Sequence, residues 1–114
     1  MNDPRLSETA GKCVAEPENS IVVSAAVAWE IAIKAQLGKL VLPLPADQFV
    51  DTRIKYHGFR TLDISVSHAV RTFHLPLYHR DPFDRILVAQ AQVEGLPLVT
   101  SDPLITQYGV SVIW

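Results

Sequence analysis

The stretch His79-Arg80-Asp81-Pro82-Phe83-Asp84-Arg85 decides how this chain of 114 residues folds. It leads into an apolar helix over residues 84–92, and residues 96–100 then read as a short buried strand. Asp102 opens the next turn, so Asp84 and Asp102 both lie at the ends of elements. Because ligands bind at the carboxyl ends of strands in open α/β sheets, this unit is expected to carry a site.

The composition predicts one globular domain over residues 1–114, with 48% hydrophobic and 19% charged residues. A net charge of −2 gives no general basic field, so nucleic-acid binding would depend on a local patch or a metal ion. Cys13 is the single cysteine, which excludes an intrachain disulfide and fits a cytoplasmic protein. The polar N-terminus is not a signal peptide, and no apolar run reaches the roughly 18 residues of a membrane span.

Helical patterns alternate with short apolar segments along the chain. Helices are expected over residues 8–14, 25–37, 46–56 and from Ser65 or Ser67 to 73, in addition to the helix after Asp84. Ser24 is expected to cap the helix over 25–37, whose shared apolar face contains Ala26, Trp29, Ile33 and Leu37. On the helix over 46–56, the residues expected to face inward are Phe49, Val50 and Ile54. Strands are expected at residues 21–24, 59–64, 97–100 and 110–113. Since no hairpin signal such as Asn-Gly occurs, the sequence predicts an α/β fold with a largely parallel sheet.

Three acidic residues stand where a site at the sheet end would need them: Glu30, Asp84 and Asp102. Clustered carboxylates bind Mg²⁺ or Mn²⁺, which are hard cations that prefer oxygen ligands. Such an ion can activate water and stabilise the transition state of phosphodiester cleavage.

Each acid also has a purely structural interpretation. Glu30 and Lys34 are spaced i,i+4 in the order that favours an ion pair on a helix. Asp81 fits the N-cap of the following helix, which places Asp84 in its first turn, where an acid complements the helix dipole. Asp102 before Pro103 repeats the cap pattern. A capping carboxylate can still offer an oxygen to a metal ion, so both interpretations stay open.

Other chemistry has little support in the sequence. The four histidines, His57, His68, His74 and His79, show no metal-ligand spacing, which favours surface or packing roles. No glycine-rich phosphate loop and no serine nucleophile motif occurs. Arg80 and Arg85 flank the two aspartates of the opening stretch and could hold nucleic-acid phosphates, or could simply be solvated.

Four blocks of the chain resemble the PIN-domain family and, within it, the VapC-type ribonuclease toxins: residues 23–34 (VSAAVAWEIAIK), 38–40 (GKL), 79–91 (HRDPFDRILVAQA) and 98–102 (LVTSD). The resemblance implies a Rossmann-like α/β/α sandwich and an endoribonuclease dependent on Mg²⁺ or Mn²⁺. The matching catalytic and metal-binding acids are Glu30, Asp84 and Asp102, with Asp81 as a further candidate. Lys34, Arg80 and Arg85 are the candidate contacts to RNA phosphates.

The resemblance also implies partners. Members of this family pair with a small antitoxin encoded beside them, and homodimers are common. Their first strand ends in a catalytic aspartate, and neither that aspartate nor this central strand has a counterpart here. We therefore expect weaker metal binding, and either a rearranged sheet or an oligomer in which a strand can be swapped between chains, because exposed strand edges invite pairing.

Two other functions remain to be weighed against a ribonuclease. The chain could be a catalytically inactive PIN remnant that binds an antitoxin or a second copy of itself, which the missing aspartate favours. It could also be an α/β protein that binds a small molecule, although the absence of a phosphate loop gives this little support. Cleavage of a structured RNA with Mg²⁺ or Mn²⁺, compared between this chain and Asp84→Asn, separates the ribonuclease from the other two.

Overall fold

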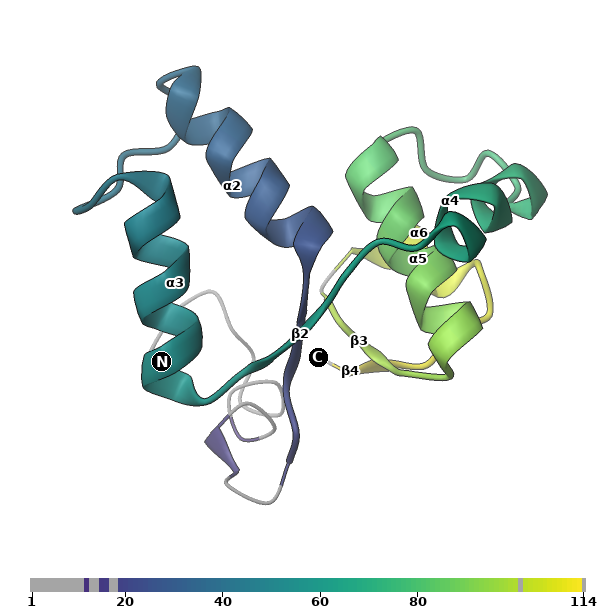
Figure 1. Cartoon of the computed structure of the whole chain (residues 1–114). Coiled ribbons are helices and arrows are strands. Elements are labelled where there is room, and N and C mark those ends of the chain that lie inside the picture. Colours follow the sequence, from purple (N-terminus) through teal and green to yellow (C-terminus); the bar gives the residue numbers. More distant parts are fainter. Residues whose placement is uncertain (1–11, 13–14, 17–18, 101, 114) are drawn as a thin grey trace. The chain divides into compact units, whose positions relative to one another are not determined.

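The structure is a computed structural model that describes Lys12, Ala15, Glu16, residues 19–100 and residues 102–113. The chain divides into two compact units, one of residues 20–64 and the other of residues 1–19 with 65–114. Both units contain helices and parallel strands, as the predicted α/β class requires (Figure 1). The single domain over 1–114 stays a prediction. Of the helix predicted over 8–14, only Lys12 lies among the described residues.

The unit of residues 20–64 has two strands and two helices. Strand β1 (Val22–Ser24) pairs in parallel with β2 (Arg60–Leu62). Helix α2 (Ala25–Gln36) begins directly after β1, because the Ser24 hydroxyl accepts the Ala26 N–H at 3.0 Å and so caps the helix as predicted. Helix α3 (Ala46–His57) ends at Gly58, whose φ of +66° is a left-handed conformation that glycine adopts without strain.

The apolar face predicted for α2 is only partly buried. Ala26 is fully buried, whereas Trp29 and Leu37 are 59% and 62% exposed. On α3, the residues expected to face inward, Phe49 and Ile54 among them, are half-buried. The helical periodicity was therefore predicted correctly, but it did not predict how much of each apolar face is covered.

The second unit surrounds one long helix. Helix α4 (Val66–Arg71) and the 3₁₀ turn η1 (Thr72–His74) precede α5 (Pro82–Glu94), against which α4 packs. Strand β3 (Leu98–Val99), helix α6 (Pro103–Thr106) and strand β4 (Val112–Ile113) follow, and β3 pairs in parallel with β4. The core of this unit joins α5 to the segments around it and contains Leu75, Val88, Ala89, Ile105 and Tyr108.

The strands are shorter than predicted, and the described residues form two separate two-stranded ladders. The segment predicted over 97–100 pairs only at Leu98 and Val99, and the segment over 59–64 pairs only at residues 60–62. After these strands the chain continues to a helix cap, which is Ser65 before α4 and Asp102 before α6. Among the described residues, no helix combines the length and apolar character needed to cross a membrane.

Candidate metal centre

Two aspartates of the second unit are fixed at helix starts by local sequence. Asp81 caps α5 by accepting the Phe83 N–H at 2.8 Å, and Pro82 fills the first helical position, which places Asp84 at the third. Asp102 follows β3 and caps α6, where its Oδ1 accepts the Leu104 N–H at 2.9 Å. Both predicted caps are confirmed, and they leave Asp84 and the second oxygen of Asp102 facing the same small space.

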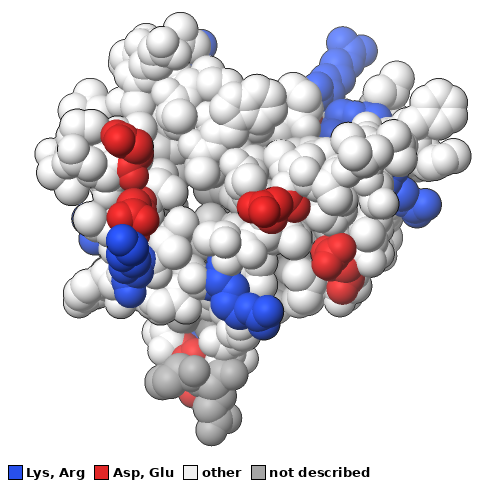
Figure 2. Space-filling view, viewed as in Figure 1, with Lys and Arg blue, Asp and Glu red and all other residues white. Residues whose placement is uncertain are grey.

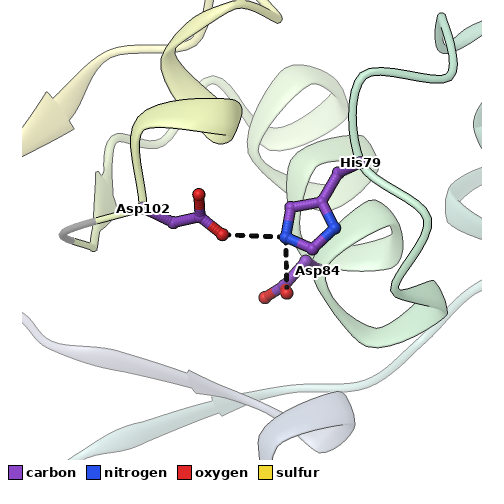
Figure 3. A group of neighbouring side chains, drawn as sticks. All are labelled: His79, Asp84 and Asp102. Atoms are coloured by element: carbon purple, nitrogen blue, oxygen red, sulfur yellow. Dashed lines mark hydrogen bonds and ion pairs between the residues drawn. The ribbon is translucent and has the colours of Figure 1, made fainter.

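His79 lies between these two carboxylates. Its Nε2 is 2.8 Å from Oδ2 of Asp102 and 3.0 Å from Oδ2 of Asp84 (Figure 3). The ligand atoms of the three side chains all lie within 4.8 Å of one another. The imidazole is 14% exposed, whereas the two carboxylates are each about a third exposed, at 31% and 32%. The two carboxylates are therefore more accessible to a cation from solvent than the ring is.

The hydrogen bonds of His79 fix where its proton is. Nδ1 accepts the backbone N–H of Asp81 at 3.1 Å, so this nitrogen carries a lone pair. Nε2 then carries the hydrogen, donates it to Oδ2 of Asp102 at 2.8 Å and lies 3.0 Å from Oδ2 of Asp84. In the neutral Nε2–H tautomer the ring acts toward Asp84 and Asp102 as a hydrogen-bond donor.

The backbone of His79 is hydrogen-bonded through both its N–H and its carbonyl. The His79 N–H donates to the Tyr108 hydroxyl at 2.8 Å, and that hydroxyl donates to the Pro76 carbonyl at 2.7 Å. The Arg85 guanidinium donates to the Pro76 carbonyl at 3.0 Å and to the His79 carbonyl at 3.3 Å. Its other terminal nitrogen reaches the carbonyls of Thr72 and Leu75 at 3.0 and 3.3 Å. Arg85 of α5 and Tyr108 thus hydrogen-bond to the backbone of residues 72–79 and position His79.

The pKa of Asp102 departs from its ordinary value. The hydrogen bond from the Leu104 N–H lowers the pKa of Asp102, and contact with His79 adds to this effect, while partial burial opposes it. Asp102 is therefore ionised at neutral pH and offers a charged oxygen.

The remaining predicted site residues make other contacts or are exposed. Glu30 is on α2 in the unit of residues 20–64, where its Oε2 pairs with Lys34 Nζ at 3.2 Å, as the i,i+4 spacing predicted. Asp81 uses one oxygen as a cap. Arg85 is committed to backbone carbonyls, whereas Arg80 is exposed. On the face that Figure 2 shows, charged side chains of both signs occur singly or in small groups on a mostly uncharged surface.

Sequence reasoning did not single out His79 or Tyr108. His79 stands five residues before Asp84, a separation without meaning on a regular helix, and the bond from the Asp81 N–H to Nδ1 holds its ring beside the start of α5. Tyr108 is 29 residues from His79 in the chain, and no local pattern predicts that contact. The one available signal was a histidine directly preceding a capped, acidic helix start.

Comparisons with known proteins give two findings. The family model described as "PIN domain" matches residues 1–110. The protein named Ribonuclease VapC16, from Mycobacterium tuberculosis, is 48% identical over 70 residues. The aligned part covers 58% of this chain and 48% of that protein, so the chain spans about half the length of this relative.

Proposed function

The chain belongs to the PIN-domain family, and from this premise we propose that it is a metal-dependent endoribonuclease of the VapC toxin type. The family resemblance and the α/β class predicted from the sequence are thereby confirmed, whereas the activity is our proposal. The observation that carries it is the convergence of Asp84 and Asp102, whose carboxylate oxygens lie with His79 Nε2 within 4.8 Å of one another.

The residues present fit a divalent cation. Carboxylate oxygens are the ligands that Mg²⁺ and Mn²⁺ prefer, and the lowered pKa keeps Asp102 charged. The first turn of α5, where Asp84 lies, fixes its carboxylate at a rigid helix start. A bound ion would supply an activated water and would stabilise the charge that develops on the phosphodiester. The chain itself holds the carboxylate of Asp84, from α5, close to the carboxylate of Asp102, from the start of α6.

The other residues enter the proposal with different support. Glu30 is included as a third acid on the sequence resemblance alone. Lys34 and Arg80 are proposed to contact RNA phosphates because both are exposed cations, and Lys34 would exchange its ion pair with Glu30 for the phosphate. Arg85 is proposed to position the site, because its guanidinium already donates hydrogen bonds to four backbone carbonyls. Asp81 is proposed as a cap rather than a ligand.

The test is cleavage of a structured RNA with Mn²⁺ or Mg²⁺. We expect cleavage by the wild-type chain and a loss of at least about a hundredfold in Asp84→Asn and in Asp102→Asn, because each removes a charged ligand. Asparagine caps a helix about as well as aspartate, so Asp102→Asn should leave α6 intact. Asp51→Asn is the matched control, because Asp51 is an exposed acid paired with Lys55 on α3. Equal cleavage by all four chains, or cleavage unaffected by chelator, would overturn the proposal.

The proposed partners are RNA, an antitoxin and a second copy of this chain. Large apolar side chains are exposed on the described part of residues 20–64, where Trp29 is 59% and Val41 is 92% exposed. These side chains also give the alternative function its support, namely an inactive module that only binds an antitoxin or itself. A chain that binds Mn²⁺ nowhere and cleaves nothing, yet self-associates, would favour the alternative.

A further inference from the structure

The imidazole of His79 contacts both carboxylates that are proposed to hold the cation. Its Nε2 contacts Oδ2 of Asp84 and Oδ2 of Asp102 at 3.0 and 2.8 Å (Figure 3). Oδ1 of Asp102 already accepts the Leu104 N–H, so Oδ2 is the oxygen of Asp102 with which a cation would bond. The N–H of His79 and a divalent ion therefore compete for the same oxygen.

His79 cannot serve as a metal ligand in this pose. A ligand nitrogen needs its lone pair, so Nε2 would have to lose its hydrogen and Nδ1 would gain one. The Asp81 N–H points at Nδ1 from 3.1 Å, and a second hydrogen there would put two donors face to face. The ring can accept the Asp81 N–H or coordinate a metal through Nε2, but it cannot do both.

We infer that His79 is a placeholder for the metal, which means that its Nε2–H holds the carboxylates of Asp84 and Asp102 together in the metal-free chain. The His79 side chain leaves this position when the cation binds. This inference rests on the proposed function, in which these two aspartates hold the ion. His79 is a positioning residue in this account, since it acts through the two acids. Its N–H offsets the repulsion between the two carboxylates.

The way in which the ring leaves is also defined by the structure. The backbone of His79 is fixed on both sides, because its N–H donates to Tyr108 and its carbonyl accepts from Arg85. Displacement must therefore be a rotation of the side chain, which breaks the Asp81 N–H bond to Nδ1. Metal binding should release the ring to solvent without moving the loop.

The first test is direct and needs no variant. Mn²⁺ is bound to the wild-type chain and electron spin-echo envelope modulation is recorded, since a coordinated imidazole nitrogen gives a characteristic modulation. We expect no such modulation. A nitrogen signal that disappears in His79→Gln would identify His79 as a ligand and overturn the inference.

The second test is the affinity for Mn²⁺, measured from the free-ion electron paramagnetic resonance signal. His79→Ala removes the competing N–H and should bind Mn²⁺ roughly tenfold more tightly, the effect of one hydrogen bond to a charged group. His79→Gln keeps an N–H donor and should stay within about threefold of wild type. His74→Ala, which changes an exposed histidine of the same unit, is the control. Unchanged or weaker binding by His79→Ala would contradict the placeholder role.

Failure of this inference can be told apart from failure of the proposed function. If wild-type chain binds no Mn²⁺, or binds it equally well in Asp84→Asn, the metal centre itself is wrong and the inference falls with it. If Mn²⁺ binding is lost in Asp84→Asn but His79 supplies a nitrogen ligand, the metal centre stands and only the placeholder role is overturned.

Discussion

The hydroxyl of Tyr108 accepts the backbone N–H of His79 at 2.8 Å, although 29 residues separate the two in the chain. The same hydroxyl donates to the Pro76 carbonyl at 2.7 Å, and the tyrosine belongs to the buried core of its unit with an exposure of 8%. This contact links the packing around α5 to the loop that carries His79. The stability of the core and the geometry of the metal centre therefore depend on one side chain.

Removing that hydroxyl should destabilise the chain. Tyr108→Phe leaves the His79 N–H and the Pro76 carbonyl without this partner, and a buried unsatisfied group costs about 1–3 kcal/mol of unfolding free energy. Urea denaturation measures the change. Tyr56→Phe is the matched control, because Tyr56 is 82% exposed and its hydroxyl should contribute less than about 0.5 kcal/mol. Equal stability of both variants would show that the Tyr108 contact is unimportant.

The Arg85 guanidinium should not be replaceable by an amine. The planar guanidinium of Arg85 reaches the carbonyls of Pro76, His79, Thr72 and Leu75. Lysine keeps the positive charge but has no such planar group. Arg85→Lys should therefore lose about 2 kcal/mol or more of unfolding free energy. Arg53→Lys, at an exposed arginine over the Phe49 ring, should cost less than about 1 kcal/mol. If thermal melts place both variants at the same midpoint, Arg85 does not fasten the loop.

Arg80 should behave in the opposite way. Because it is exposed, Arg80→Gln should leave the melting midpoint unchanged while it weakens RNA binding and reduces the salt dependence of binding by about one phosphate contact. RNA affinity is measured by filter binding at several salt concentrations, with a chelator present to prevent cleavage. A loss of stability with no change in the salt slope would remove Arg80 from the RNA surface.

Asp81 should act through its cap and not as a ligand. Asp81→Ala removes the acceptor for the Phe83 N–H and should cost about 1 kcal/mol, whereas Asp81→Asn keeps a capping oxygen and should be nearly neutral. The affinity of Asp81→Asn for Mn²⁺ should match that of wild type. An asparagine variant that is fully stable but binds Mn²⁺ at least tenfold more weakly would make Asp81 a ligand.

Local chemistry made much of this fold predictable. Ser24, Asp81 and Asp102 were each expected to open a helix, and each does so through a side-chain hydrogen bond to the helix start. Gly58 and Gly95 end helices in left-handed conformations. Caps and breakers depend on residues two or three apart in the chain, so a single sequence carries their signal.

The sequence could not predict contacts between residues that lie far apart in the chain. The position of His79 depends on Tyr108 and Arg85, and neither contact follows from periodicity or spacing. The exposure of Trp29 likewise depends on what packs against α2 and not on the pattern of α2 itself. The pair Asp84 and Asp102 was expected from two element ends, and the helix starts that hold them bring them to one imidazole.

The central claim is that Asp84 and Asp102 hold one divalent cation together, and a double-mutant cycle on Mn²⁺ affinity tests it most directly. Paramagnetic resonance titrations would compare wild type, Asp84→Asn, Asp102→Asn and the double variant, with Asp51→Asn as control. We predict one Mn²⁺ site in wild type and in the control. Each single variant should lose at least about tenfold in affinity, and the double variant should lose less than the sum of the two, since both serve one ion. Binding that is unchanged in the single variants, or two losses that add as independent sites, would contradict the account.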